Sequence, residues 1–255
     1  MLELHDLCRN FGSLQAVKSM NMRLKKGEIR GLIGPNGSGK TTTFNLISGF
    51  LKPTSGTVYF EGQEISGWQP HQIAQAGLIR TFQLTSIYSD LSAFDNVVMA
   101  AECQRKSSLL AKVFHLSSAR EEDSSIANIA HEILEKFKLS DVAHVRAGDL
   151  PGGTRKILGI ANAMAGNPLL LMLDEPLAGL NTSEKPLLMD KIRGLRAEGL
   201  TILIIEHDMK AIMTTCDQIT VICHGEKIAE GTPEEISQDS ATIEAYLGQN
   251  ADVYA

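Results

Sequence analysis

The sequence predicts an α/β protein with three parts: a core built on a parallel sheet, a subdomain of antiparallel strands, and an inserted α-helical subdomain. Three observations predict this fold class. Short strand-like segments separated by glycine and proline turns fill the first part of the chain, and amphipathic helical spacing marks the middle. Continuous apolar runs on either side of a predicted helix return in the last part, as expected of strands buried on both faces of a parallel sheet.

The first part predicts the antiparallel sheet and the first core strand. Turns are expected at Lys26-Gly27 and over Lys52–Gly56, where lysine, glycine and proline punctuate the pattern. Ile29–Ile33 is expected to form a core strand that runs into a glycine-rich loop, with a helix over Thr42–Ser48 after it. The expected antiparallel strands are Leu2–Leu7, Ala16–Leu24 and Val58–Phe60.

The middle part, from about Ser86 to Gly148, changes to helical character. Apolar residues at helical spacing predict an amphipathic helix over Ile126–Phe137. The polar stretch Ser117–Ser125 before it is expected to be a surface loop. Leu109–Leu116 is apolar at helical spacing, and we favour the core of the helical subdomain over a contact with partner subunits for it.

The last part returns to α/β alternation. Leu169–Leu173 and Thr201–Ile205 are the expected buried strands, with a helix over Lys185–Glu198 between them. Gln218–Cys223 and Lys227–Glu230 resemble a closing hairpin, followed by short helices. We therefore expect one domain over residues 1–255, in which 1–85 and 156–255 form the core with its antiparallel subdomain and 86–155 form the helical subdomain.

Composition and charge restrict the possible functions. The net charge is -6, so a basic surface for nucleic acid is not expected. No run approaches the roughly 20 apolar residues that a membrane-spanning helix needs, and the N-terminus lacks the pattern of a signal peptide. The scattered Cys8, Cys103, Cys216 and Cys223 suggest reduced thiols in a cytoplasmic protein, with zinc or redox roles poorly supported.

A glycine-rich segment between the first core strand and the helix after it matches the P-loop pattern of glycine, four residues, then Gly-Lys-Thr. Its glycines let backbone N–H groups form a concave nest for phosphate oxygens, and the helix directs its positive end at the same anion. Lys40 would bridge the β- and γ-phosphates, and the Thr41 hydroxyl would ligate magnesium. A chance glycine turn is the alternative, which the strand–loop–helix context disfavours. The segment is Gly34-Pro35-Asn36-Gly37-Ser38-Gly39-Lys40-Thr41.

Acidic residues follow the second core strand and a histidine follows the third. Asp174 is placed to hold a magnesium shell, and Glu175 to act as general base for the attacking water. Two acids can also simply end a strand, an alternative that the earlier P-loop makes weak. His207 could hydrogen-bond the γ-phosphate and orient the water, although a single histidine is more often structural.

Two further features are ambiguous by themselves. Gln83 follows Arg80-Thr81-Phe82 at the expected junction of the core with the helical subdomain, and alone it is an ordinary glutamine. Gly152 and Gly153 precede an apolar helix over Ile157–Ala165, where free N–H groups could bind an anion. A simple loop-to-helix turn explains this second feature equally well.

Taken in order along nearly the full length, these motifs resemble the ATP-binding subunit of an ABC transporter. The order is the P-loop, Gln83, a glycine signature, Asp174-Glu175-Pro176, Ala178-Gly179-Leu180-Asn181 and His207. The chain is most similar to the subunits of branched-chain amino acid importers. The segments that carry this finer similarity are Phe44–Phe50, Arg80–Gln83, Ile205–Lys210 and Ala245–Gly248.

The resemblance implies a RecA-like P-loop NTPase core that binds ATP and Mg²⁺. Nucleotide contacts would extend from Gly34 to Thr42, Phe11 would stack on adenine (a core aromatic is the rival interpretation), and Gln83 would reach the magnesium. Gly152 and Gly153 would contact a nucleotide held by a second ATP-binding subunit, and Ala178–Asn181 would line the dimer interface. Two membrane permease subunits and, indirectly, a periplasmic or extracellular solute-binding protein complete the expected assembly, at the cytoplasmic side of the inner or plasma membrane.

Three departures from the family pattern concern the glycine signature and its helix. Pro151 stands where a serine is usual, Thr154 where a glutamine is usual, and Asn162 where an arginine is common. Proline cannot donate a side-chain hydrogen bond to a γ-phosphate, although it suits the first turn of a helix. We therefore expect an asymmetric heterodimer in which the site completed by this signature is impaired, or slow turnover if the assembly is a homodimer.

Other functions share this cassette. An ATP-gated clamp on DNA or ribosomes usually has two cassettes, a long coiled-coil insertion or a basic surface, none of which this sequence has. Subunits for urea or amide import, for other amino acids or for lipid export are closer alternatives. The Arg80–Gln83 and Glu206–Met209 segments favour the importer subgroup.

Overall fold

The computed structural model describes residues 1–81, 87–102 and 117–251, without the side chains of 117–123 and 247–251. The chain forms two compact units. The first contains residues 1–80, 169–178 and 185–255, and the second contains residues 81–168 and 179–184. Gln83 and the apolar segment Leu109–Leu116 lie outside the described residues.

An antiparallel sheet of four strands opens the first unit. The strands are β1 (Leu2–Phe11), β2 (Leu14–Leu24), β4 (Ser55–Phe60) and β5 (Gln63–Glu64), in the order β2-β1-β4-β5. In β1, Leu4 pairs with Met22 of β2 and with Val58 of β4. All three side chains are buried, so cross-strand apolar packing fixes the register of this sheet.

A second, mostly parallel sheet carries the functional loops. Its order is β10-β9-β3-β8-β7-β6, and β9, β3, β8 and β7 pair in parallel. Every residue of β3, β7 and β8 is buried, which explains the apolar runs Leu170–Leu173 in β7 and Ile202–Ile205 in β8. Arg30 interrupts β3, and its buried guanidinium pairs with Glu28 at 2.7 Å. The strands are β3 (Ile29–Ile33), β6 (Leu78–Thr81), β7 (Leu170–Asp174), β8 (Thr201–Ile205), β9 (Gln218–Cys223) and β10 (Glu226–Gly231).

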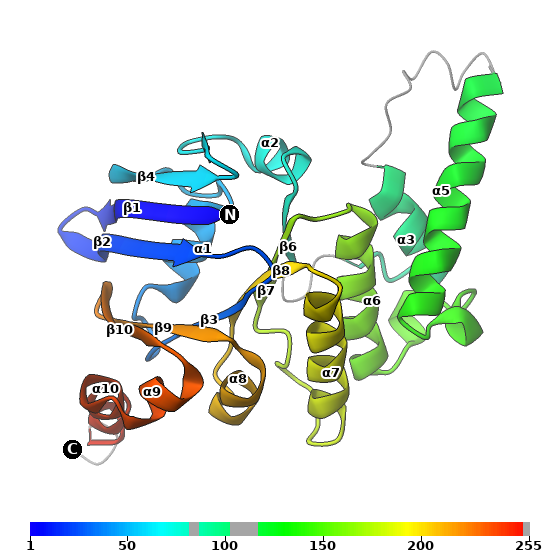
Figure 1. Ribbon diagram of the computed structural model, residues 1–255. Helices are drawn as coiled ribbons and strands as arrows, with labels where there is room; N and C mark the ends of the chain where they lie inside the picture. Colours follow the sequence, from blue (N-terminus) through cyan, green and yellow to red (C-terminus); the bar gives the residue numbers. More distant parts are fainter. Residues whose placement is uncertain (82–86, 103–116, 252–255) are drawn as a thin grey trace. The chain divides into compact units, whose positions relative to one another are not determined.

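The core of the first unit lies between the two sheets. Phe44 of α1 (Lys40–Ile47) is fully buried there, together with residues of β1, β2, β3, β7 and β8. In Figure 1 the antiparallel strands lie on one side of β3 and β9, and α8, α9 and α10 lie on the other. The remaining helices are α2 (Pro70–Gln75), α7 (Glu184–Ala197), α8 (Met209–Thr215), α9 (Pro233–Gln238) and α10 (Ser240–Ala251).

The second unit is helical. It contains α3 (Ala93–Glu102), α5 (Ser117–Lys136) and α6 (Gly152–Ala165), with short 3₁₀ turns at Ser140–Val142 and Ala147–Asp149. Helices α3 and α5 lie side by side in Figure 1 and pack together. The buried Asn96 of α3 fixes the preceding loop, because its side chain exchanges hydrogen bonds of 2.7 and 3.0 Å with the backbone of Tyr88.

One expectation about this unit is wrong. Ser117–Ser125 is helical, the first part of α5, and not a surface loop. Hydrophobic periodicity cannot detect a polar stretch of helix, because no apolar face is present to set the period. Ala119, Arg120, Glu121 and Glu122 are good helix formers, and they extend the helix that contains the buried Ile126.

The predicted fold class is confirmed. The expected strands are present, with β1, β2 and β4 longer than predicted and β3 and β8 as predicted. Cys8, Cys216 and Cys223 are free thiols, and Cys103 lies outside the described residues. Among the described helices, none combines the length and apolar character needed to cross a membrane.

Candidate nucleotide-binding and hydrolysis site

The P-loop lies where the sequence placed it, between β3 and α1, and its backbone demands glycine at two positions. Gly34 has φ 150°, and a Cβ there would lie 1.9 Å from the carbonyl oxygen of Ile222. Gly39, with φ 107°, would place a Cβ 2.4 Å from the carbonyl oxygen of Ala16. Any side chain at either position would collide with backbone that cannot yield easily, so the neighbouring strands enforce this loop conformation.

Lys40 begins α1 and is folded against its own loop. Its ammonium donates hydrogen bonds to the carbonyl oxygens of Gly34 at 2.7 Å and Pro35 at 2.8 Å. Burial lowers the pKa of the Lys40 ammonium, and the nearby Glu175 carboxylate opposes that shift. A desolvated cation gains more from a close anion than an exposed one does, so this lysine is suited to phosphate.

Ser38 gives the most direct sign of what the loop can hold. Within the part of the chain that the structure describes, its buried hydroxyl has no hydrogen-bond partner. Leaving such a group unpaired costs about 1–3 kcal/mol. Its backbone carbonyl is fixed by a 2.9 Å hydrogen bond from Gly225. A phosphate oxygen in the nest formed by this loop would satisfy the hydroxyl, so the P-loop residues fit a nucleotide phosphate.

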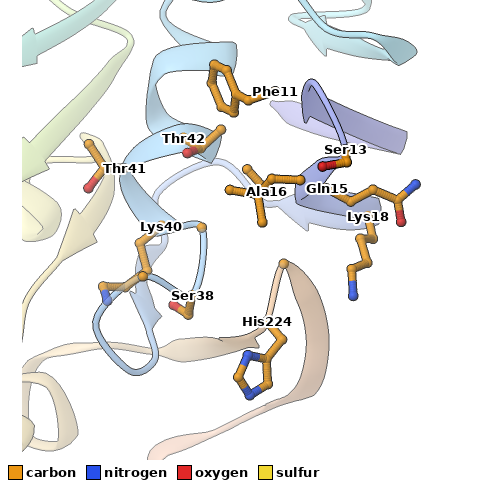
Figure 2. A pocket seen from close by; sticks show the side chains of 14 residues that line it. Phe11, Ser13, Gln15, Ala16, Lys18, Ser38, Lys40, Thr41, Thr42 and His224 are labelled. Atoms are coloured by element: carbon orange, nitrogen blue, oxygen red, sulfur yellow. The ribbon is translucent and has the colours of Figure 1, made fainter.

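A pocket of about 630 Å³ extends from the P-loop between three segments of the first unit. Figure 2 shows Lys40, Thr41 and Thr42 at one side, Phe11 and Lys18 from the first two strands, and His224 from the turn between β9 and β10. The Phe11 side chain is 44% exposed and lies 4.7 Å beneath the guanidinium of Arg9, so it is not a core aromatic. The loop residues Pro35 and Asn36 line an adjacent pocket of about 490 Å³.

Asp174 ends β7 with its carboxylate held by Arg80 of β6. One guanidinium nitrogen donates to Asp174 Oδ2 at 2.7 Å, and another donates to Asn45 Oδ1 at 2.7 Å and Ser48 Oγ at 3.0 Å. Both charged side chains are nearly buried, at 6% exposure for Arg80 and 11% for Asp174. Arg80 also lies over the ring of Phe44. This arginine therefore orients the carboxylate and joins it to α1.

Glu175 and His207 are brought into contact from the ends of two neighbouring strands. Glu175 Oε1 lies 2.5 Å from His207 Nε2. Glu175 has φ 48°, an uncommon conformation for glutamate, and its backbone N–H donates to the Ile205 carbonyl at 3.0 Å. Strained backbone of this kind persists where surrounding contacts determine it, and functional sites are frequent locations.

The glycine signature belongs to the second unit. Pro151 is the N-cap of α6. The sequence suggested a position in the first turn of the helix, which begins one residue later. Among the residues that the structure describes, a Cβ on Gly152 would meet nothing within 4 Å, whereas one on Gly153 would lie 2.6 Å from Glu184 Oε1. Glu184 in turn exchanges hydrogen bonds of 3.0 Å with the backbone and side chain of Asn181.

The structure thus groups most, but not all, of the expected site residues. Phe11, the P-loop, Asp174, Glu175 and His207 all lie in the first unit, whereas Gly152 and Gly153 lie in the second. Gln83 is outside the described residues. Sequence reasoning gave no site role to Lys18, Arg80 or His224. In the sequence, only the position of Arg80 three residues before Gln83 hinted at a role. Its contacts with Asn45, Ser48 and Asp174 became visible only in the fold.

Comparison with known proteins places the same features in context. Residues 17–178 match the family described as ABC transporter, and residues 226–252 match that described as branched-chain amino acid ATP-binding cassette transporter. The high-affinity branched-chain amino acid transport ATP-binding protein BraF of Pseudomonas aeruginosa is 40% identical over 250 residues, covering 98% of both chains. The protein LivG of Escherichia coli, with the same description, has the same identity and coverage.

Two solved structures extend the similarity to the fold. A nucleotide-free ATP-binding cassette from an ABC transporter is 31% identical with a TM-score of 0.84, covering 96% of this chain and 98% of that one. A cassette in its ADP conformation is also 31% identical, with a TM-score of 0.85, covering 97% of this chain and 98% of that one. The similarity in fold therefore extends over nearly all of both solved cassettes.

Proposed function

This chain belongs to the ABC transporter family of ATP-binding proteins, and from that premise we propose that it is the ATPase subunit of a branched-chain amino acid importer. The observation that carries the proposal is the 40% identity to BraF and LivG over 98% of both chains. The match of residues 226–252 to a family specific to branched-chain amino acid cassettes supports the same substrate class. The family is one of ATP-binding and ATP-hydrolysing proteins, so the chain is an ATPase.

The P-loop is proposed as the phosphate site. Its glycines, the desolvated Lys40 and the unpaired Ser38 hydroxyl together offer donors to the β- and γ-phosphates. Phe11, half exposed at the mouth of the pocket, offers its ring to the adenine. The contacts proposed here run from Gly34 to Thr42.

Magnesium is proposed at the Thr41 hydroxyl and the Asp174 carboxylate, with Gln83 as a further contact. These are hard oxygen ligands, which suit Mg²⁺, and a carboxylate that accepts one hydrogen bond from Arg80 retains further lone pairs. The ion would neutralise charge on the phosphates during transfer. The hydrogen bond from Arg80 fixes the position of this carboxylate.

Glu175 is proposed as the general base and His207 as the group that orients the attacking water. Their 2.5 Å contact at the ends of β7 and β8 supports a shared role. A carboxylate held beside an imidazole can accept a proton from water while the imidazole hydrogen-bonds the reacting phosphate. Glu175 lies close enough to the P-loop for its charge to affect the pKa of Lys40.

The proposed assembly is a dimer of ATP-binding subunits docked on two membrane permeases at the cytoplasmic face, served by a solute-binding protein. In it, Gly152 and Gly153 would approach a nucleotide held by the partner subunit. Pro151, which cannot donate from its side chain, would weaken the site that this chain completes.

Reconstitution tests the substrate. We expect a complex purified through a tag on this chain to take up labelled leucine, isoleucine and valine into ATP-loaded proteoliposomes, and to lose uptake in a Lys40→Ala variant. Competition by unlabelled urea, acetamide and polar amino acids serves as the specificity control. Uptake of urea or amides in place of leucine would contradict the substrate class while leaving the ATPase assignment intact.

A further inference from the structure

Glu206 is a buried carboxylate at the catalytic edge of the sheet with no role in the function proposed above. It follows Ile205, the last residue of β8, and is only 4% exposed. Its Oε1 accepts a 2.6 Å hydrogen bond from the backbone N–H of Leu177, and its Oε2 accepts one of 3.1 Å from the N–H of His207. One side chain therefore binds the backbone after β7 and the backbone after β8.

These two backbone segments carry Glu175 and His207, whose side chains are in contact. Leu177 lies two residues after Glu175, and the second N–H belongs to His207 itself. A further link runs from the Glu175 N–H to the Ile205 carbonyl. The Glu206 carboxylate therefore fixes the spacing between the backbone segments that carry Glu175 and His207, whose side chains approach to 2.5 Å.

The electrostatic surroundings make this arrangement costly. Burial raises the pKa of Glu206, backbone hydrogen bonds from Leu177, His207 and Asp208 lower it, and the negative charge of Glu175 raises it further. Lys185 is the nearby cation whose own pKa is affected by Glu206. A buried acid beside a second acid is retained against its desolvation cost, which indicates a role other than packing.

The acid on the other side of His207 has a different task. Asp208 is the N-cap of α8, accepting a 3.1 Å hydrogen bond from Ala211, and it pairs with Lys185 at 2.8 Å. Its bonds therefore anchor the helix that follows His207. Glu206 alone of these two acids bonds the segment that carries Glu175.

We propose that Glu206 is a positioning residue for ATP hydrolysis, acting by holding Glu175 and His207 at their working separation. The inference rests on the proposed roles of Glu175 and His207. An ionised carboxylate offers an acceptor to each N–H, whereas a glutamine offers one acceptor and one donor, and the donor would face an N–H. Glu206→Gln therefore releases one of the two segments with almost no change in volume.

The test compares Glu206→Gln with wild type in the purified transporter complex, using single-turnover hydrolysis of labelled ATP and fluorescent-ATP binding. We expect hydrolysis to slow by about 10²-fold, the order reached when a reacting group is displaced by about 1 Å, with the ATP dissociation constant within about twofold of wild type. Glu206→Asp keeps the charge but is one methylene shorter, so we expect the same defect. It provides a second variant if the glutamine variant does not fold.

A double-mutant cycle separates positioning from general damage. If Glu206 acts through His207, adding Glu206→Gln to His207→Ala should change the rate less than twofold, because the geometry it maintains is already lost. The control is Glu28→Gln, which removes another buried acid that accepts a backbone N–H, from Lys25, and that also pairs with Arg30 at 2.7 Å. Glu28 precedes β3, at the opposite end of that strand from the P-loop. We expect the substitution to lower the melting temperature with no change in the hydrolysis rate.

The proposal is overturned by a wild-type rate in Glu206→Gln and Glu206→Asp, by additive effects in the cycle, or by a loss of ATP affinity that matches the loss of rate. Failure of the underlying function has another signature. In that case the wild-type complex does not hydrolyse ATP, or Glu175→Gln hydrolyses it at the wild-type rate.

Discussion

Two glycine-rich loops begin helices in this protein, and they contain glycine for different physical reasons. In the P-loop, Gly34 and Gly39 have positive φ values, and a Cβ on either would meet backbone oxygen at 1.9 and 2.4 Å. In the signature, no described residue lies within 4 Å of a Cβ built on Gly152, and a Cβ on Gly153 would face the side chain of Glu184. The fold itself demands glycine in the first loop. In the second, the described fold leaves room for a side chain at Gly152, and the partner's nucleotide proposed above is what would require glycine there.

The largest expected effect is on the free energy of unfolding, which alanine substitutions in the two loops should change differently. Gly34→Ala should lower the free energy of unfolding by more than about 3 kcal/mol, since strain at this φ adds to a collision with Ile222. Gly152→Ala should leave stability unchanged or raise it by about 0.4–1 kcal/mol. Denaturant unfolding of the isolated subunit measures both. Equal destabilisation by the two substitutions would contradict the distinction.

The same Gly152→Ala subunit should nevertheless be defective in the assembled transporter. A methyl group there would project into the space that we propose a partner's γ-phosphate enters, so we expect ATPase activity of the complex to fall about tenfold or more. Binding of fluorescent ATP to the isolated subunit should match wild type. If the complex with this substitution hydrolyses ATP normally, no nucleotide approaches Gly152.

Gly153→Ala should have an intermediate effect that depends on Glu184. The new Cβ would displace the Glu184 carboxylate and break its bond to the Asn181 N–H, a capping interaction worth about 1 kcal/mol. In a Glu184→Ala background the displaced group is absent, and Gly153→Ala should then alter stability by less than about 0.5 kcal/mol. Thermal melts of the four combinations make the comparison. Additive losses would show that Glu184 is not the obstacle.

Pro151→Ser should change the stability of the subunit only slightly. Serine is a preferred N-cap, and Pro151 occupies that position in α6, so the substitution should stabilise the subunit by about 0.5 kcal/mol. It should also raise the ATPase rate of the assembled transporter, because a hydroxyl donor is restored to the signature. An unchanged rate would mean that the altered signature is not a limitation.

The same comparison shows what the sequence could predict. The P-loop was predicted from local spacing because a strand, a loop and a helix that follow one another in sequence also adjoin in space. Strands at Leu169–Leu173 and Thr201–Ile205 were predicted from unbroken apolar runs, and β7 and β8 are observed at Leu170–Asp174 and Thr201–Ile205. The α5 extension over Ser117–Ser125 was missed because it has no apolar period.

Contacts between distant segments could not be predicted in this way. Arg80 and Asp174 are 94 residues apart, and Glu206 and Leu177 are 29 apart, so their hydrogen bonds depend on strand order in the parallel sheet. Residue type alone gave no signal for Glu206, which resembles any acid at a strand end. The roles assigned to Glu175, His207 and the signature glycines remain predictions.

The central claim is that this chain separates ATP binding, at the P-loop, from hydrolysis, at Glu175. The most direct measurement is ATP binding and phosphate release in the purified complex for Glu175→Gln and Lys40→Ala side by side. The account predicts that Glu175→Gln binds ATP as tightly as wild type with turnover reduced by about 10²-fold or more, whereas Lys40→Ala loses binding itself. Substantial hydrolysis by Glu175→Gln would contradict the claim and remove Glu175 from the role of general base.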